Sequence, residues 1–561
     1  MKKQFLNTSA ADKKLSLSRR LFNYSSAFVV LFTFSQFGIA QSPAILWQKC
    51  IGGSKDELIF NMIKLRDGNY LYCGQTNSPD GDFNVSNKKF DAFLLKTNST
   101  GIVIWKTTYG GSRNEIFYNI IETETGDIIA IGTTGSNNSP VQGHHGNPGT
   151  DDVWLVRTSS AGVLINQRCF GGSGSEGTPD LGECQGLIID HNGNILFTAQ
   201  SNSNDGDISN NHGDYDGWVV KLKPTFQVEW AITIGDAAYD NMYNISEING
   251  FYLVTGTKAT KSYADFPNVH DYFKAHAAKI DQSGNIIWYR IYGGSGSDDC
   301  NSSVASSDGN LVLTGHAFST DGDCVSNSGF NTWTWKINVN NGVIMWQNYT
   351  GGSPTDTAAA FNIISTRDGG FIVMGFIGHI FDPIGFDAYA VKLDANGITQ
   401  YTKRFGGSGV EGMQCGVEAN NGSILIAGWT SSNDADVSGN HGGLDGWLVS
   451  LEENTNRISN KSVLTKNKPV LTNALKTYPN PISSSVTIIY SIPQSTKVSL
   501  KIVDIMGRPI KTLVNGEIAA GSYNIQWNVD DEKGRSVPTG IYFLRMEGGD
   551  YLQTKKLIVT K

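Results

Sequence analysis

Residues 105–115 read Trp105-Lys-Thr-Thr-Tyr-Gly-Gly-Ser-Arg-Asn-Glu115, and the chain repeats the frame of this segment seven times. In each copy the first residue is followed after five positions by a glycine and after ten positions by an acid. The copies lie about 55 to 64 residues apart, and they begin at Trp47, Trp105, Asn166, Trp230, Trp288, Trp346 and Tyr401. A repeat of this length that is filled with short strands indicates a propeller or a solenoid.

Each copy contains four strand-like runs, which we name strands a to d. In the first copy they lie at 58–65, 69–75, 92–97 and 102–108. Four strands per copy is the content of one propeller blade. The last copy stops after strand c at Leu451, whereas an extra strand d at 44–51 precedes the first copy. We therefore predict an all-β, seven-bladed β-propeller at 41–454 whose N-terminal strand closes the last blade, because this closure leaves no open sheet edge.

The connections between strands differ in length. Strands a and b are joined by short turns such as Asp67-Gly68, and most c–d turns also contain a glycine. Such residues supply the positive φ of hairpin turns. The b–c connections are long, and the d–a connections hold the Gly-Gly pair. One face of the ring therefore carries hairpins and the other carries long loops, and we predict a ligand site on the long-loop face because loops on a rigid scaffold carry function.

The acid that ends each frame is the first candidate functional group. It occurs in every copy, at Glu57, Glu115, Glu176, Asp240, Asp298, Asp356 and Glu411. Seven carboxylates near the axis would suit a cation. A residue that every blade needs is more typical of a structural task, such as accepting N–H groups of the glycine turn, and we expect this structural role.

Aspartates in the b–c loops form the second candidate. They recur two positions apart, at Asp80, Asp82, Asp205, Asp207, Asp321, Asp323, Asp434 and Asp436. Calcium binds several oxygen ligands on a compact loop, and this spacing supplies two. The bidentate Glu of an EF-hand loop is absent from the sequence, and Asp is also a common turn residue. Calcium is thus the one cofactor that the sequence suggests, with ordinary turns as the alternative.

Histidines and aromatic residues gather in the long b–c loops of blades two and four, at 134–151 and 258–273. Blade four also departs from the Asp-x-aromatic-x-x-Lys pattern of most third strands, whose rings we expect to fill the space between blades. Flat rings can stack on a sugar, and polar groups beside them can form hydrogen bonds with its hydroxyls. We predict a ligand site, with loop drift as the alternative, at His144, His145, Tyr263, Phe266, His270, Tyr272 and His276.

The chain has seven cysteines and no Cys-x-x-Cys pair, so a zinc site built on cysteine is not expected. We predict one disulfide, between Cys300 and Cys324, because both lie on the long-loop side of blade five. It would close a loop of about 24 residues, and it would stabilise the fold by roughly 3 kcal/mol in the chain-entropy description.

The N-terminus predicts export. Residues 1–40 combine a basic region, an apolar run at 27–34 and the small residues of Gly38-Ile39-Ala40, which is the order of a secretory signal peptide. The alternative, a membrane anchor, is disfavoured because the run is short and has polar flanks. The formal net charge of −8 argues against nucleic acid and anionic membranes as partners.

Two resemblances to known families follow from particular residues. The segment from Val391-Lys392-Leu393-Asp394 to Tyr401 resembles the tryptophan-docking repeat of quinoprotein-like propellers, in which the Trp motif is structural. After a linker at 455–476, strand-like runs at 486–492, 498–505, 523–529, 541–546 and 552–559 predict a small β-sandwich. Residues 477–561 resemble the type A C-terminal sorting domain of the type IX secretion system of Bacteroidota, at Tyr478, Pro479, Asn480, Pro481, Gly507, Arg508, Gly540, Tyr542, Lys555 and Lys556.

The second resemblance implies a route and its partners. The signal peptide would carry the chain across the inner membrane into the periplasm. The type IX machinery would then move the folded protein across the outer membrane, and a sorting-domain peptidase usually removes the domain. The mature protein would be attached to the outer-membrane surface or secreted.

The chemistry at the end of this route is less specified. The sequence contains no nucleophile elbow, no HExxH and no P-loop. We therefore predict a non-enzymatic, monomeric propeller that binds a glycan or a protein partner. The alternative is a secreted, endoglucanase-like hydrolase that uses two carboxylates on the long-loop face.

Overall fold

The computed structural model describes residues 42–560 except 86–88, 148, 178–185, 261–272, 325–329, 352–355, 380–384, 453–474, 479, 493–495, 506, 519–520 and 549–550. The described chain is built of strands, turns and loops, and it divides into two units, residues 1–457 and 458–561. No helix in the described part has the length and apolar character to cross a membrane. The predicted signal peptide and most of the predicted linker lie outside the described residues.

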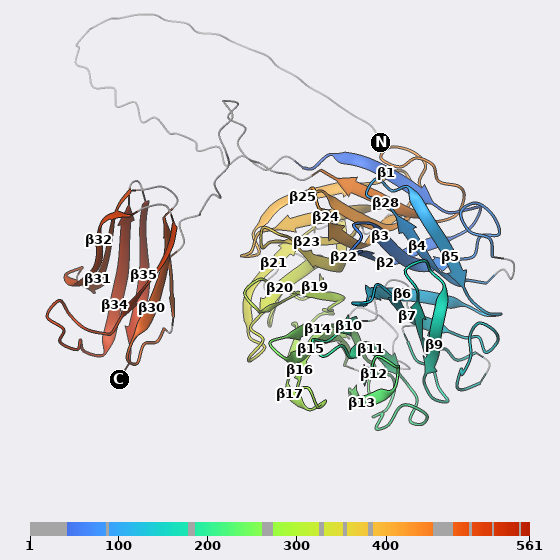
Figure 1. Ribbon diagram of the computed structural model, residues 1–561, viewed down its shortest axis with the longest axis horizontal. Helices are drawn as coiled ribbons and strands as arrows, with labels where there is room; N and C mark the ends of the chain where they lie inside the picture. Colours follow the sequence, from blue (N-terminus) through green and yellow to red (C-terminus); the bar gives the residue numbers. More distant parts are fainter. Residues whose placement is uncertain are drawn as a thin grey trace, which may run out of the picture. The chain divides into compact units, whose positions relative to one another are not determined.

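Seven four-stranded antiparallel sheets make up the described part of the first unit and surround a common axis (Figure 1). We number them as blades one to seven in the order of their first strands. Blades one to three are β2 (Glu57–Lys64), β3 (Tyr70–Thr76), β4 (Asp91–Thr97), β5 (Val103–Tyr109); β6 (Glu115–Glu122), β7 (Ile128–Thr134), β8 (Asp152–Thr158), β9 (Leu164–Phe170); and β10 (Leu187–Ile189), β11 (Ile195–Ser201), β12 (Asp216–Leu222), β13 (Val228–Ile234). Blades four to six are β14 (Asp240–Ile248), β15 (Phe251–Ala259), β16 (Phe273–Ile280), β17 (Ile286–Tyr292); β18 (Ser302–Ala305), β19 (Leu311–Ala317), β20 (Asn331–Ile337), β21 (Ile344–Thr350); and β22 (Asp356–Ser365), β23 (Phe371–His379), β24 (Phe386–Leu393), β25 (Thr399–Phe405).

Blade seven joins the two ends of the first unit. Its strands are β26 (Glu411–Glu418), β27 (Ile424–Thr430), β28 (Asp445–Leu451) and, on the outside, β1 (Ile45–Ile51). Strand β1 pairs antiparallel with β28, as the sequence predicts. Each innermost strand contacts that of the next blade, and β2 contacts β26. The first unit is therefore a closed β-propeller of about seven blades.

The predicted hairpin turns are present on one face of the ring. In blade one, Leu65 donates its N–H to Asn69 O (2.9 Å), Gly68 donates to Leu65 O (3.0 Å), and Gly68 has a φ of 85°. Turns of the same form recur between strands c and d, as at Gly101. We call this face the hairpin face and the opposite one, which carries the b–c loops and the Gly-Gly turns, the long-loop face.

Near the axis, the first strand of most blades contains a β-bulge, which faces a glycine in the second strand. In blade two the register shifts between Phe117 and Asn119, and Gly132 lies opposite. A Cβ on Gly132 would lie only 1.6 Å from Ile116 O. Equivalent glycines, each 1.9 Å from a strand a carbonyl by the same measure, are Gly74, Gly256, Gly375 and Gly428. Blade three has a short first strand and Ala199 at this position. The bulge therefore requires the glycine, and the recurrence of glycine at this position of the second strand is a sequence signal of the bulge.

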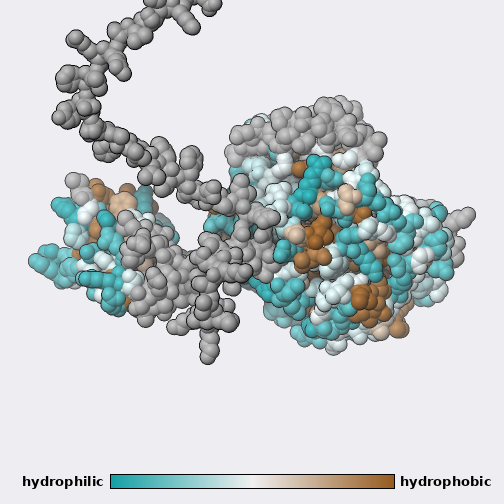
Figure 2. Space-filling view, turned by 90° about the horizontal axis from the view of Figure 1, so that it is seen from above, coloured by the Kyte–Doolittle hydropathy of each residue, from teal (hydrophilic) through white to brown (hydrophobic). Residues whose placement is uncertain are grey.

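The third strands fill the space between blades with buried rings, as expected. Trp154 donates its indole N–H to Gln167 Oε1 (2.9 Å) on the neighbouring strand d. Trp333 and Trp447 make the same bond to Gln347 (3.0 Å) and Gln48 (2.9 Å). This pairing lets a polar N–H be buried without losing its hydrogen bond. The outermost strands leave aliphatic side chains such as Ile104 and Ile165 half exposed, and Figure 2 shows apolar residues as separate patches among hydrophilic ones.

The second unit has two sheets that share one hydrophobic core, the arrangement of a β-sandwich. One sheet contains β29 (Leu475–Tyr478), β30 (Val486–Ile492) and β33 (Gly521–Trp527); the other contains β32 (Pro509–Ile518), β31 (Thr496–Asp504), β34 (Gly540–Gly548) and β35 (Tyr551–Val559). Ile488, Leu500, Trp527 and Leu544 are fully buried in the core. Strands β29 and β32 were not predicted from the sequence. Strand β32 begins with a proline, contains Asn515-Gly516 and is largely part-exposed, so it lacks the alternation of a buried strand.

Candidate functional site

The repeated acid holds the Gly-Gly turn, which is the structural role that we expected. Glu57 Oε2 accepts the N–H of Gly53 (2.8 Å), and its other oxygen accepts the hydroxyl of Thr76 (2.5 Å). The same contacts recur around the ring, with glycine N–H distances of 2.7 Å at Glu115, 3.0 Å at Glu176, 2.8 Å at Asp298 and 2.9 Å at Glu411. Burial raises the pKa of Glu57, Glu115 and Glu176. These carboxylates are engaged with their own turns.

The paired aspartates of the b–c loops brace the same turn from the other side. Asp80 Oδ1 accepts the N–H of Ser54 (2.7 Å), and Asp82 donates its N–H to Gly52 O (2.9 Å). Matching contacts join Asp205 to Ser173 (2.7 Å), Asp321 to Ser295 (2.6 Å) and Asp434 to Ser408 (2.7 Å). Within the described residues no three His, Cys, Asp or Glu side chains are placed to hold a metal ion. Calcium at these loops stays a prediction, and the geometry favours the turn-bracing alternative.

Histidines of the long-loop face bind the first residue of strand c. His145 donates its N–H to Asp152 Oδ2 (2.9 Å), and its Nδ1 lies 2.7 Å from the same oxygen. His212 with Asp216 and His441 with Asp445 repeat the ring contact at 2.6 Å. The three histidine side chains are 38, 48 and 46% exposed, whereas the aspartates are fully buried. Because this contact recurs in three blades, we interpret it as a structural contact that holds the b–c loop against strand c.

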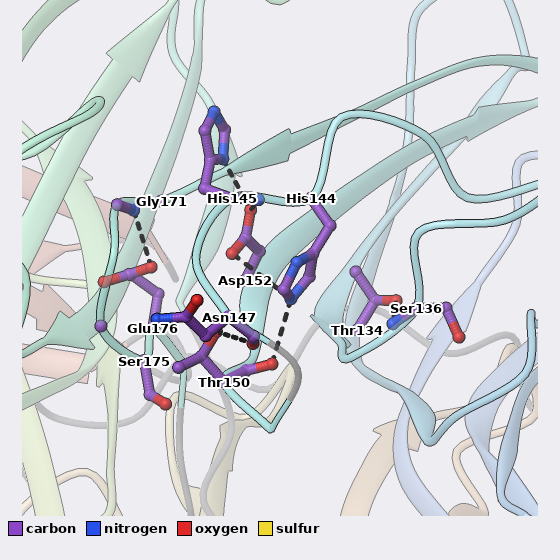
Figure 3. Close-up of polar contacts among 12 residues, drawn as sticks. Thr134, Ser136, His144, His145, Asn147, Thr150, Asp152, Gly171, Ser175 and Glu176 are labelled. Carbon is purple, nitrogen blue, oxygen red and sulfur yellow. Dashed lines mark hydrogen bonds and ion pairs between the residues drawn. The ribbon is translucent and has the colours of Figure 1, made fainter.

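The predicted ligand residues of blade two lie together, on either side of one carboxylate. His144 and His145 flank Asp152, and His144 Nε2 lies 3.0 Å from Thr150 O (Figure 3). Burial raises the pKa of Asp152, and hydrogen bonds from His145 oppose this rise. The predicted ligand residues Tyr263, Phe266, His270 and Tyr272 lie outside the described residues.

His276 is not available to a ligand, which corrects the prediction for blade four. Its side chain is fully buried, with Nδ1 2.7 Å from Tyr289 Oη and Nε2 2.9 Å from Asn241 O. Burial lowers the pKa of His276 to about 4. His276 occupies the strand c position that blades two, five and seven give to Trp, and Tyr289 stands where those three blades have Gln. The pair is the blade-four form of the Trp–Gln contact.

Lys274 has an equally structural explanation. Where blades two and three meet, the carboxylates of Asp152 and Glu176 both lie next to Gly171. A Cβ atom added to Gly171 would be 2.9 Å from an oxygen of Asp152 and 2.3 Å from an oxygen of Glu176. Where blades four and five meet, Lys274 replaces the first of these acids and lies 3.5 Å from Asp298. Blade four therefore has an ion pair where blades two and three have two neighbouring acids. The departure of blade four from the repeat neutralises the negative charge of Asp298.

Cys300 and Cys324 are thiols in the structure, so the predicted disulfide is wrong. Both side chains are fully buried in one core cluster, where Cys300 Sγ contacts Ser302 O (3.7 Å) and Cys324 Sγ contacts Asp298 Oδ1 (3.5 Å). Burial raises the pKa of both thiols. The two residues belong to the same blade and therefore share a core, but their sulfur atoms are not in bonding geometry.

On the hairpin face, side chains of neighbouring blades clamp one another around the axis. Arg66 donates its backbone N–H to Glu122 (2.8 Å), and the guanidinium Nε of Arg367 donates to Glu418 (2.8 Å). His191 donates its N–H to Glu247 (2.9 Å), and Lys64 contacts Asn420. Where blades five and six meet, the equivalent residues are small: Ser307 and Ser365. The ring of clamps is therefore incomplete at that junction.

Three hollows lie on the hairpin face, opposite to the predicted face. The axial hollow, of about 550 Å³, is lined by Lys64, Val304, Ile364, Ser365, Thr366, Arg367, Gly416, Val417, Glu418 and Asn420. A second hollow of about 390 Å³ between blades six and seven shares Thr366, Arg367, Glu418 and Asn420 with it. A third, of about 420 Å³, lies between blades two and three. The hairpin face was not predicted as a site because its turns are short.

The motif residues of the second unit tie its strands together. Asn480 donates to Lys556 O and accepts from the N–H of Ile558, both at 2.8 Å, so Asn480 is fastened to β35. Arg508 binds Asp504 (2.7 Å) across the turn at Gly507, where φ is 78°. Tyr542 donates its hydroxyl to Pro538 O (2.9 Å). Lys556 is exposed and Lys555 part-exposed, whereas Pro479 lies outside the described residues.

Residues 476–560 match the sequence model of a family described as Secretion system C-terminal sorting domain. The second unit is therefore a C-terminal sorting domain of type IX secretion, as its motif residues suggest. Such a domain indicates that the chain is exported and then attached to the surface or secreted, and it implies interaction with the type IX machinery.

The chain also has distant similarities to solved structures. The chain is similar to PorZ, a surface component of the type IX secretion system of Porphyromonas gingivalis, at 10% identity and a TM-score of 0.29 over 92% of this chain and 75% of PorZ. It is similar to a puromycin hydrolase (9% identity, TM-score 0.42, 81% and 62%) and to a mutant NanB sialidase from Streptococcus pneumoniae (11%, 0.36, 73% and 70%). No curated protein sequence matches the chain. Likenesses at this level do not bear on activity.

Proposed function

We propose that the protein is an exported, seven-bladed propeller at 41–454 that binds a glycan or a protein partner without transforming it. In this proposal the linker at 455–476 and the sorting domain at 477–561 deliver the propeller to the outer-membrane surface or the medium. The fold, the sorting domain and the predicted signal peptide all support this route.

The axial hollow is the observation that carries the proposal. It is a concave site on a rigid ring, where a ligand can bind with little rearrangement of the scaffold. A glycoside hydrolase needs two carboxylates that face the scissile bond and are free to exchange protons. On the hairpin face, Glu418 is held by Arg367 (2.8 Å) and Asp368 by Lys392 (2.9 Å). Because Arg367 and Lys392 already occupy these two carboxylates, the groups suit recognition better than acid catalysis.

Incubation of the mature chain, residues 41–561, with a panel of polysaccharides and peptides tests this proposal. Binding is measured by biolayer interferometry, and the release of reducing ends is measured on the same samples. We expect binding without product. Release of reducing ends above that of a protein-free blank would contradict the proposal and favour the hydrolase alternative, and loss of that release in a Glu418→Gln, Asp368→Asn double variant would assign the reaction to the hairpin face.

A further inference from the structure

The axial hollow has an aliphatic wall that comes from three different blades. Val304, Ile364 and Val417 stand near the ends of the innermost strands of blades five, six and seven. All three side chains are partly exposed toward the hairpin face. No aromatic residue is among the described residues that line this hollow. A wall of this kind suits an aliphatic side chain better than a sugar, which proteins commonly bind with flat rings.

The rim of the axial hollow carries one cation whose charge is not neutralised. The guanidinium of Arg367 binds Glu418 (2.8 Å), Ala419 O (2.8 Å) and Asn420 O (3.2 Å), so its charge is paired and each of its three nitrogens already donates one hydrogen bond. The ammonium of Lys64 contacts the side-chain oxygen of Asn420, which is a neutral amide. Among the described residues no carboxylate forms an ion pair with Lys64. The hollow therefore offers a free positive charge next to an aliphatic wall.

We propose that the axial hollow binds the C-terminus of a protein or peptide. The terminal carboxylate would lie against Lys64, and an aliphatic last side chain would lie against Val304, Ile364 and Val417. This inference rests on the proposed function, because it assumes that the propeller binds rather than transforms its partner. A hollow of about 550 Å³ falls within the range of small-ligand pockets. Capture of a terminal carboxylate is a recurring mode of peptide recognition, and bonds to an ionised group are the strong ones.

Fluorescence polarisation of labelled pentapeptide pools tests this assignment on the mature chain. Each pool has a fixed last residue, either Val, Ile, Leu, Ser or Lys, and is made both as the free acid and as the C-terminal amide. We expect free acids that end in Val, Ile or Leu to bind at least about tenfold more tightly than their amides, as a charge-assisted hydrogen bond requires. Lys64→Gln should remove this difference, and Lys64→Arg should restore most of it.

Lys223→Gln is the matched control, since Lys223 is an exposed lysine on a c–d turn of the same face in blade three. It should leave the affinity unchanged. Equal binding of acids and amides, or an unchanged preference in Lys64→Gln, would overturn the assignment. Competition by isovalerate at the affinity of the peptides would overturn the peptide in favour of a small carboxylate. Binding of glycans alone would overturn this inference and leave the proposed function standing, whereas release of reducing ends would overturn the proposed function itself.

Discussion

Replacement of Gly132 by Ala should destabilise the propeller, although Gly→Ala in a strand ordinarily stabilises by about 0.5–1 kcal/mol. The added Cβ would lie 1.6 Å from Ile116 O and 2.6 Å from Ile116 C, where ordinary contact begins at 3.4 Å. Both atoms are backbone, so β6 and β7 must separate near the bulge. Overpacking costs about 1–3 kcal/mol, and two weakened ladder hydrogen bonds add about 1 kcal/mol each. We expect a loss of about 3–5 kcal/mol in the free energy of unfolding.

Guanidinium unfolding followed by tryptophan fluorescence measures this loss as a lower midpoint at unchanged slope. Ala199→Gly in blade three is the control, because Ala199 occupies the same strand position where the first strand is short. That change removes one methyl group and adds backbone freedom, so it should cost only about 1–2 kcal/mol. If Gly132→Ala costs no more than Ala199→Gly, the bulge does not require its glycine and the reasoning fails.

Three further outcomes follow from the closure, the buried acids and the sorting domain. Deletion of residues 42–51 removes β1, in which Cys50 and Ile51 are buried. This deletion should lower the melting temperature far more than deletion of ten linker residues does, and equal melting temperatures of the two variants in calorimetry would contradict ring closure. Burial raises the pKa of Asp240 from 3.8 to about 6, so the protonated side chain favours the folded state at acid pH, and this contribution is lost as the pH rises from about 4 to 6. The free energy of unfolding of Asp240→Asn should therefore increase by up to about 3 kcal/mol relative to that of the parent between pH 4 and pH 7. Parallel pH profiles of stability for the two proteins would refute this. Removal of residues 475–561 should leave the propeller's unfolding transition unchanged and retain the protein in the periplasm, and its display on intact cells would count against this.

Local patterns in the sequence were enough to predict the class of fold. The seven-fold frame, the Asp-Gly turns and the strand alternation all depend on contacts within about ten residues, and such contacts leave a direct trace in spacing. The pairing of β1 with β28 joins residues about 400 positions apart, yet it was predictable because the last copy lacks one strand. Strand ends differed from the prediction by about one residue in blade one, as at β5 (Val103–Tyr109), and by up to two residues in the second unit, as at β33 (Gly521–Trp527), because the pattern of burial ends where the turn begins.

The site depended on contacts that the linear pattern does not record. His276 stood out in the sequence as a departure from the repeat, and only the fold shows that Tyr289 and Asn241 enclose it. Cys300 and Cys324 share a core cluster without sharing a bond. The axial hollow opens between Lys64 and Val417, which meet only because the ring closes.

The sequence by itself thus determined the repeat, the closure of the ring and the sorting domain, because each is set by residues that are close in the chain or by the count of strands. Only the tertiary structure reveals the hollows of the hairpin face and shows which charges around them are engaged. Those properties arise where side chains of different blades meet around the axis, and their distances depend on how the whole ring packs.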